Sequence, residues 1–284
     1  MKKNIFINFK GIIHFIISSN SNKGQIIYRL FLFLCWQFYK RVVALPIISK
    51  LDNNSLFILH PNSTNATANI YVNTYESEFI DFLRKNLPQD GILIDVGAHM
   101  GIYSLLLNDK FIKGYLFEPS SDTFQILQDN LYLNRFNDKF HAYNLCVSNS
   151  TKTVKFNQTN VLSGTNSIIH SEEDASNATI KNAISLDGFI KEIDEITFIK
   201  IDVEGHEFEI LSGAVNILKN SKNLILLYEN SNFDQIYTLL NAINYTIFSI
   251  SKKGELIRDV NHLRNAYNLI AISNSHEKIS NYLQ

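Results

Sequence analysis

Two segments of the chain combine acidic side chains with glycine in patterns that could do chemistry. The first, residues 94–104, reads Ile-Asp-Val-Gly-Ala-His-Met-Gly-Ile-Tyr-Ser. Gly97 would allow a tight turn after a strand, and Gly101 would let a ligand approach the backbone of the following helix. The next predicted strand ends at Glu118, 21 positions after Gly97. A carboxylate at about this separation, roughly 20 residues, accepts hydrogen bonds from ribose hydroxyls, so the pattern predicts a nucleoside-containing cofactor.

The residues of the turn favour one such cofactor. In the dinucleotide pattern Gly-x-Gly-x-x-Gly the middle glycine makes room for a pyrophosphate, but His99 stands at that position here. Asp95 would repel a pyrophosphate and attract the ammonium and sulfonium groups of S-adenosylmethionine. We therefore expect Asp95, Gly97, His99 and Gly101 to form the turn that binds the methionine part of S-adenosylmethionine, and Glu118 to bind its ribose. An NAD-dependent oxidoreductase is disfavoured by the same residue, His99.

The second segment, residues 198–209, ends an apolar run and opens a helix with the sequence Phe-Ile-Lys-Ile-Asp-Val-Glu-Gly-His-Glu-Phe-Glu. Acids in a first helical turn interact favourably with the helix dipole, but Asp202 at a strand end needs another reason. Ligands of open α/β sheets bind at such strand ends, here beside the predicted cofactor. Asp202, Glu204 and His206 are the candidates for catalysis at this end, and the sequence does not decide which of them is the base.

Other residues extend the predicted site. Glu76 could close over the cofactor, although it could equally be an exposed helix start, and Ser148, at the end of the third strand, could face the adenine. Two carboxylates and a histidine could ligate Mg²⁺ or Mn²⁺. Their spacing matches no dedicated metal motif, so no metal is assigned.

Strands and helices alternate from Gly91 onward, which indicates a parallel sheet covered by helices on both faces. Continuous apolar runs predict buried strands, and two closing strands without a crossover helix between them predict an antiparallel hairpin at a sheet edge. We expect an appendage at residues 1–74 and a catalytic domain at residues 75–284. The predicted strands are Ile92–Val96, Tyr115–Glu118, His141–Ser148, Thr197–Val203, Leu224–Glu229, Tyr245–Ile250 and Leu269–Ser273.

Taken together, these motifs resemble the FkbM family of S-adenosylmethionine-dependent methyltransferases over roughly residues 75–273. The resemblance implies a Rossmann-like α/β fold with a seven-stranded, mostly parallel sheet whose last strand is antiparallel. It also implies O-methylation of a sugar, glycolipid or related metabolite, in bacterial polysaccharide or glycoconjugate biosynthesis. His99 departs from the family, which usually carries Asn at this position. The matching motifs are residues 94–101, Phe117-Glu118-Pro119, Leu186-Asp187, residues 199–207, Leu211-Ser212-Gly213-Ala214, Tyr228-Glu229 and Asn244-Tyr245.

Composition restricts the partners and the compartment. The 26 basic and 27 acidic residues leave a net charge of −1, without the basic excess of a nucleic-acid-binding protein. Cys35 and Cys146 are far apart in the sequence, which argues for a reducing compartment. We expect a cytoplasmic enzyme with a small-molecule or glycan acceptor. A methyltransferase with a protein or other small-molecule acceptor stays an alternative. A non-catalytic scaffold is disfavoured because the acidic residues of both motifs are present.

The amino-terminal segment predicts a helix from Gln25 to Val43 that is apolar almost all round. Its apolar run Leu30–Trp36 is far shorter than the roughly 20 residues needed to span a bilayer. Arg29 and the pair Lys40–Arg41 flank the run, so cations could meet anionic head groups. The helix therefore predicts either a peripheral contact at the inner face of the membrane or a contact between two copies of the chain, unless it packs on the catalytic domain.

Overall fold

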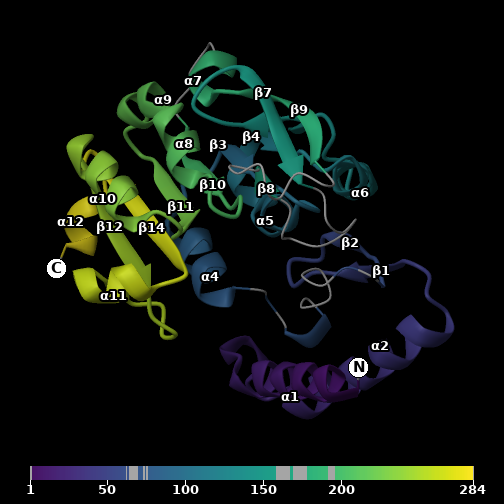
Figure 1. The fold of residues 1–284 in the computed structure, drawn as a ribbon. Coiled ribbons are helices and arrows are strands. Elements are labelled where there is room, and N and C mark those ends of the chain that lie inside the picture. Colours follow the sequence, from purple (N-terminus) through teal and green to yellow (C-terminus); the bar gives the residue numbers. More distant parts are fainter. Residues whose placement is uncertain are drawn as a thin grey trace.

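Apolar runs in the second half of the chain form neighbouring strands of one twisted sheet in the computed structural model (Figure 1). The structure describes residues 2–61, 63, 70–72, 74, 76–157, 167–168, 178–190 and 196–283. Among these residues the largest sheet has eight strands in the order β13-β12-β14-β11-β10-β3-β4-β5. Its strands are β3 (Gly91–Val96), β4 (Phe111–Phe117), β5 (Phe140–Tyr143), β10 (Phe198–Ile201), β11 (Ile225–Glu229), β12 (Tyr245–Ile250), β13 (Leu256–Ile257) and β14 (Asn268–Ser273).

The expected mostly parallel sheet with an antiparallel last strand is confirmed. Strands β5, β4, β3, β10 and β11 are parallel neighbours, and β14 runs antiparallel to both β11 and β12. The two-residue strand β13 adds to the predicted seven. The polar stretch between β12 and β14 also holds a short helix, α11 (Val260–Asn265), which the sequence pattern did not indicate. The predicted antiparallel pair at one sheet edge is confirmed: β12 and β14 are antiparallel neighbours, and only the two-residue β13 lies beyond β12.

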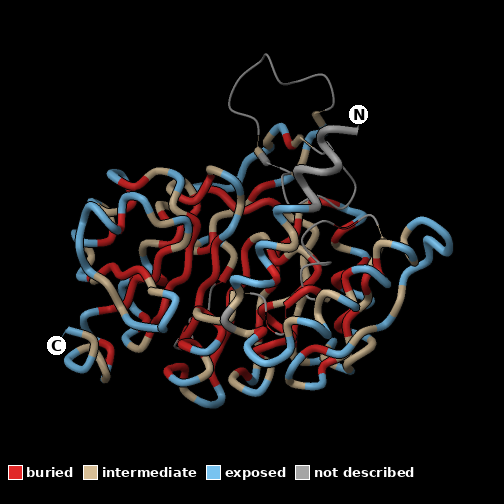
Figure 2. The backbone as a smooth tube through the Cα atoms, turned by 90° about the horizontal axis from the view of Figure 1, so that it is seen from below, coloured by how far each residue is buried: buried red, intermediate tan, exposed pale blue. Residues whose placement is uncertain are grey.

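Helices cover both faces of this sheet, and alternate strand residues face the two cores. In β10, Phe198 belongs to one core and Ile199 to the other. Figure 2 shows the buried positions concentrated along these central strands. The first core packs against α4 (Ser77–Asn86), α5 (Ile102–Leu106) and α6 (Ser121–Leu133); the second packs against α7 (Leu186–Phe189), α8 (Glu207–Ser212), α9 (Val215–Asn220), α10 (Phe233–Ala242) and α11.

The predicted strand His141–Ser148 is confirmed only as far as Tyr143, because the chain leaves the main sheet at Asn144. The Asn144 side chain donates hydrogen bonds to the carbonyls of Glu118 and Pro119, at 2.8 and 3.0 Å. The residues that follow join a second sheet of order β6-β9-β7-β8 within the described residues. Its strands are β6 (Cys146–Val147), β7 (Lys152–Asn157), β8 (Ser167–Ile168) and β9 (Ala178–Ile184).

The amino-terminal part forms two helices, α1 (Lys2–Ser18) and α2 (Ile26–Val42), followed by a hairpin of β1 (Ile47–Lys50) and β2 (Leu56–Leu59). The predicted helix Gln25–Val43 is confirmed as α2, whereas α1 was not expected. Figure 1 shows α1 and α2 side by side at one end of the molecule, outside the sheet layers. Among the described residues, no helix is both long and apolar enough to cross a membrane. Short helical segments complete the fold at η1 (Asn20–Asn22), η2 (Asn108–Lys110) and α12 (Ile279–Tyr282).

Two asparagines, one in α6 and one just after it, attach the hairpin to the part of the chain that forms the main sheet. Asn130 is fully buried; its Oδ1 accepts a hydrogen bond from the Ile58 N–H at 2.8 Å, and its Nδ2 donates to the Met100 carbonyl at 2.9 Å. One turn further on, Asn134 accepts from the N–H of Leu56 and donates to its carbonyl, at 2.8 and 2.7 Å. Asn130 thereby ties β2 to the glycine turn that follows β3.

Replacing Asn130 by Ala should lower the free energy of unfolding by about 1–3 kcal/mol, because two buried backbone groups would lose their partners. Denaturant unfolding of the variant measures this loss. Asn137→Ala is the matched control, since Asn137 is exposed in the turn after α6, and its loss should stay within about 0.5 kcal/mol. An equal loss of unfolding free energy in the two variants would contradict a stabilising role for the buried hydrogen bonds of Asn130.

Candidate functional site

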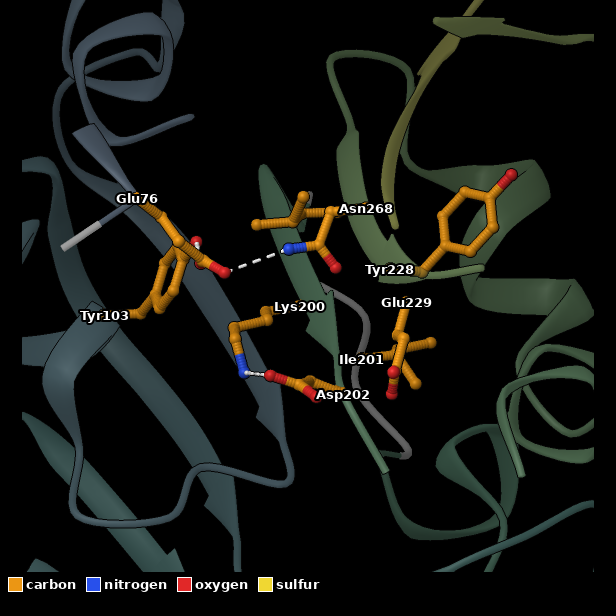
Figure 3. Close-up of a pocket in the computed structure, with 9 residues that line it drawn as sticks. Glu76, Tyr103, Lys200, Ile201, Asp202, Tyr228, Glu229 and Asn268 are labelled. Carbon is orange, nitrogen blue, oxygen red and sulfur yellow. Dashed lines mark hydrogen bonds and ion pairs between the residues drawn. The ribbon is translucent and has the colours of Figure 1, made fainter. Parts of the chain in front are cut away.

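A pocket lies where the carboxyl ends of β10 and β11 meet the segment that leads into α4 (Figure 3). The pocket lies at the carboxyl ends of the parallel strands, which is where ligands of open α/β sheets bind. It is lined by Glu76, Tyr103, Lys200, Ile201, Asp202, Leu227, Tyr228, Glu229 and Asn268.

The buried cation of the site is Lys200, whose side chain comes from the middle of β10. Its Nζ lies 3.1 Å from Asp202 Oδ2 and 4.0 Å from Asp95 Oδ1, and 5.2 Å from the centre of the Tyr103 ring. Burial lowers the pKa of Lys200, but the carboxylates of Asp202 and Asp95 outweigh that effect and raise it above its usual value. Lys200 is therefore a fixed positive charge between the ends of β3 and β10.

Glu76 is the residue just before α4, and its side chain lines the pocket. Neither of its two predicted roles is confirmed, but the structure shows its contacts. Its backbone is left-handed, with a φ of 47°. One carboxylate oxygen accepts a hydrogen bond from the Tyr103 hydroxyl, and the other accepts from Asn268 Nδ2 at 3.0 Å (Figure 3). Burial raises the pKa of Glu76 despite the Tyr103 hydroxyl. Glu76 thus connects α5 to β14 across the pocket.

The glycine turn brings the ends of β3 and β4 together. Gly97 has a φ of 73°, and a Cβ atom there would lie only 2.0 Å from the Asp202 carbonyl oxygen, so no side chain fits. Glu118 is buried and accepts two backbone hydrogen bonds, from the N–H of His99 at 2.9 Å and that of Ser120 at 2.8 Å. Burial raises the pKa of Glu118 to about 7 against the effect of these donors.

The two remaining residues of the predicted cofactor turn, His99 and Gly101, both have a left-handed backbone. Gly101 has a φ of 84°, and a Cβ atom there would lie 2.7 Å from Leu127 Cδ1 of α6. His99 is also left-handed, with a φ of 51°. Its Nε2 is buried and has no hydrogen-bond partner within the described part of the chain. Burial, and then the charge of Lys200, lower the pKa of His99 to about 4, so the ring is neutral.

The loop after β10 is held by Glu207 and presents Glu204. Glu207 Oε1 accepts hydrogen bonds from the N–H groups of Val203 and Gly205, both at 3.2 Å, and Oε2 accepts one from the Ser231 hydroxyl. Glu204 takes a left-handed φ of 54°, and its side chain is exposed. Partial burial together with the nearby carboxylates, first that of Glu229, raises the pKa of Glu204 to about 7.

His206 and Ser148 contact each other and do not line the pocket. Ser148 Oγ and His206 Nε2 lie 2.9 Å apart, and both side chains are buried. On the other side of the ring, His206 Nδ1 lies 3.6 Å from Glu209 Oε2. This arrangement links β6 to the start of α8, so the Ser148 hydroxyl and the imidazole are both engaged inside the protein.

The structure therefore brings most predicted site residues to one sheet edge: Asp95, Gly97, His99, Gly101, Glu118, Glu76, Asp202 and Glu204. Sequence reasoning missed Lys200, Tyr103, Glu229 and Asn268. Lys200 had a signal, because a lysine inside the apolar run Phe198–Ile201 needs a buried counter-charge. Tyr103 and Asn268 had none. In the described part of the chain, no cluster of three His, Cys, Asp or Glu side chains could hold a metal ion.

The neutral, buried ring of His99 makes a pH-dependent contribution to stability. Between its ordinary value of 6.5 and about 4, the unfolded chain binds a proton that the folded state excludes, so stability falls as the pH falls. Between about pH 7 and pH 5 the native protein should lose about 2 kcal/mol more than His99→Asn. Urea unfolding of both proteins at each pH measures the difference. The pH-dependent contribution of Glu118 to the free energy of unfolding cancels, because both proteins contain Glu118. Parallel losses would contradict a pKa near 4.

Comparisons with known proteins agree with the motifs. The model of the methyltransferase FkbM domain matches residues 95–248, more than half of the chain. Hexuronic acid methyltransferase AglP of Haloferax volcanii is 29% identical over 162 residues, which cover 56% of this chain and 64% of that protein. Methyltransferase sdnD of Sordaria araneosa is 24% identical over 161 residues, covering 45% of this chain and 62% of that protein. The chain thus matches less than two thirds of the length of these relatives.

Among solved structures, methyltransferase FkbM from Methylobacillus flagellatus aligns at a TM-score of 0.44 and 18% identity, over 65% of this chain and 44% of that one. The domain match begins at Asp95, in the glycine turn, and includes the acidic loop after β10. The resemblance read from these motifs is confirmed, and the chain belongs to the FkbM methyltransferase domain family.

Proposed function

We propose that the chain is an S-adenosylmethionine-dependent O-methyltransferase that acts on a hydroxyl of a sugar or sugar-containing metabolite. The observation that carries this proposal is the joining of the two predicted motifs. The Gly97 turn contacts the Asp202 backbone, so the predicted cofactor residues and the acidic loop share one sheet edge. Family membership supports methyl transfer as the reaction.

The residues of the turn suit S-adenosylmethionine. Asp95 Oδ1, His99 Nε2 and Glu229 Oε2 are buried and lack hydrogen-bond partners among the described residues, so the site has polar atoms left for a ligand. Its carboxylates outnumber its one buried lysine, which favours a cofactor with ammonium and sulfonium groups. We assign Asp95, Gly97 and Gly101 to the methionine part and Glu118 to the ribose. When bound, S-adenosylmethionine would supply an electrophilic methyl group.

The acceptor side of the site is the loop after β10. Lys200 holds the Asp202 carboxylate through an ion pair of 3.1 Å, which fixes Asp202 at the pocket. Glu204 is exposed and its pKa of about 7 lies at neutral pH, which suits a general base that takes the proton of an acceptor hydroxyl. His206 is less suited because its ring is buried against Ser148. We therefore assign proton transfer to Glu204 and acceptor positioning to Asp202.

A sugar is the acceptor class that the site supports best. Carboxylates accept hydrogen bonds from hydroxyls, and Asp202, Glu204 and Glu229 lie together on the acceptor side. The similarity to a hexuronic acid methyltransferase points the same way. No metal is part of the proposal.

Cofactor binding should depend on Glu118. Glu118→Ala removes a carboxylate whose hydrogen bonds to a ligand would contribute roughly 1.5–3 kcal/mol. Titration calorimetry with S-adenosylmethionine, its demethylated product and NAD measures the affinities, and NAD should not bind. Glu255→Ala is the control, because Glu255 is exposed in the turn before β13. Unchanged affinity in a folded Glu118→Ala protein would contradict the ribose assignment.

Methyl transfer should depend on Glu204 through turnover and on Asp202 through KM, while cofactor affinity stays within a few-fold. Removing a general base typically lowers the rate by about 10²–10⁴-fold, so Glu204→Gln should lose this factor and the native protein's rate should rise with pH near pH 7. Asp202→Asn should mainly raise KM. Transfer of a labelled methyl group to a panel of uronic acids and neutral glycosides measures both effects, with Glu277→Gln as the control. Near-normal turnover in both variants would place the acceptor site elsewhere.

A further inference from the structure

Helix α2 exposes a continuous apolar stripe. Five of its residues recur at intervals of three or four positions, the spacing of one helix face. All five are apolar, and between 57 and 85% of each side chain is exposed. They are Ile27, Phe31, Leu34, Phe38 and Val42.

The opposite face of the same helix is packed against the protein. Phe33 and Trp36 are buried, and the Phe33 ring meets the Tyr71 ring edge-on at 5.2 Å. Asn22, just before α2, is fully buried and donates hydrogen bonds to the carbonyls of Ile16 and Tyr71, each at 2.9 Å. Only one face of α2 is therefore buried against the protein, and the apolar stripe on its other face is free to contact another surface.

Charge around the stripe has one sign. The first 51 residues contain eight Lys and Arg and no Asp or Glu, whereas the rest of the chain contains 18 Lys and Arg and all 27 acidic residues. Arg41 is exposed at the carboxyl end of α2, and Lys23 is exposed just before the helix. Lys10 on α1 and Lys50 at the end of β1 are exposed as well. A helix face that is apolar along its length, with exposed cations just before the helix and in its last turn, complements an anionic lipid bilayer.

We propose that the stripe docks α2 into the interfacial layer of an anionic membrane, with the helix lying parallel to the surface. Interfacial helices bury an apolar face by about 5–10 Å, and nearby cations meet the phosphates of the head groups. A second copy of the chain is the less suitable occupant. A two-fold contact through the stripe would bring the cation at one end of the stripe beside a cation of the other copy, whether the two helices run parallel or antiparallel, and this part of the sequence offers no acid to pair with them.

Membrane docking is independent of methyl transfer, because no residue of the stripe lines the pocket. It would place a catalytic domain next to membrane-bound acceptors, but its test needs neither cofactor nor acceptor. The failure of one proposal is therefore distinguishable from the failure of the other.

Vesicle flotation of the full chain tests the proposal. The protein should float with vesicles of phosphatidylcholine containing roughly one third phosphatidylglycerol, and much less with pure phosphatidylcholine. Raising the salt from about 0.1 to 0.5 M should weaken binding, since screening shortens the reach of the cations. Lys40→Gln with Arg41→Gln should lower the partition coefficient by roughly tenfold or more, at about fivefold per cation.

The stripe variant Phe31→Ser with Phe38→Ser should lower partitioning at least tenfold. Its matched control, Tyr132→Ser with Ile180→Ser, removes two equally exposed apolar side chains on α6 and β9 and should bind like the native protein. Cys35 supplies a reporter on α2, because it is exposed whereas Cys146 is buried. A polarity-sensitive thiol dye on Cys35 should shift to shorter wavelength with anionic vesicles.

Equal flotation of the stripe and control variants would overturn the proposal, and so would absence of the native protein from anionic vesicles. Light scattering that shows a native dimer and a monomeric stripe variant would assign the stripe to a second copy instead. Thermal unfolding of each variant confirms that it is folded before the comparison, and Phe31→Ser alone serves where the double variant does not fold.

Discussion

The charge of Lys200 is the constraint on which the arrangement of the site depends. A buried cation costs several kcal/mol unless carboxylates compensate it, and Lys200 meets this requirement with Asp202 from its own loop and Asp95 from the neighbouring strand. The Tyr103 ring lies beside its Nζ, and the hydroxyl of the same ring donates to Glu76. One lysine thus fixes the carboxylates of Asp95 and Asp202 at the end of the sheet, and Tyr103 connects it to Glu76.

A second constraint joins the two halves of the site through the backbone. The Asp202 N–H donates to the Val96 carbonyl at 3.1 Å, while the Asp202 carbonyl lies where a Cβ of residue 97 would be. Only glycine allows the ends of β3 and β10 to come this close. Glu207 then closes the loop by accepting from two of its N–H groups. The predicted cofactor turn and the predicted acceptor loop are consequently one structural unit, so a change in either one moves the other.

The sequence predicted those parts of the protein whose cause is local. The glycine turn, the buried strands and helix α2 follow from backbone freedom and apolar periodicity, and each is confirmed. The second sheet was missed because its strands are short and partly polar, and because Asn144 redirects the chain through hydrogen bonds to residues 118 and 119. Within the site, Asn268 reaches Glu76 across 192 positions of sequence. Contacts of that kind depend on the order of strands, which no local pattern specifies.

The net charge of the chain does not show how unevenly the charged residues are distributed along the sequence. A net charge of −1 disfavours a polynucleotide partner when charge is averaged over the protein, but the first 51 residues are uniformly basic and the remainder is acidic. In the structure three carboxylates, those of Glu76, Asp202 and Glu229, line the pocket, whereas the exposed apolar face of α2 belongs to the basic segment. A nucleic acid would pair with the cations and leave the apolar stripe in water, whereas a lipid surface removes both kinds of group from unfavourable surroundings. The distribution of charge together with the exposed apolar stripe therefore favours a lipid surface, which the net charge alone does not indicate.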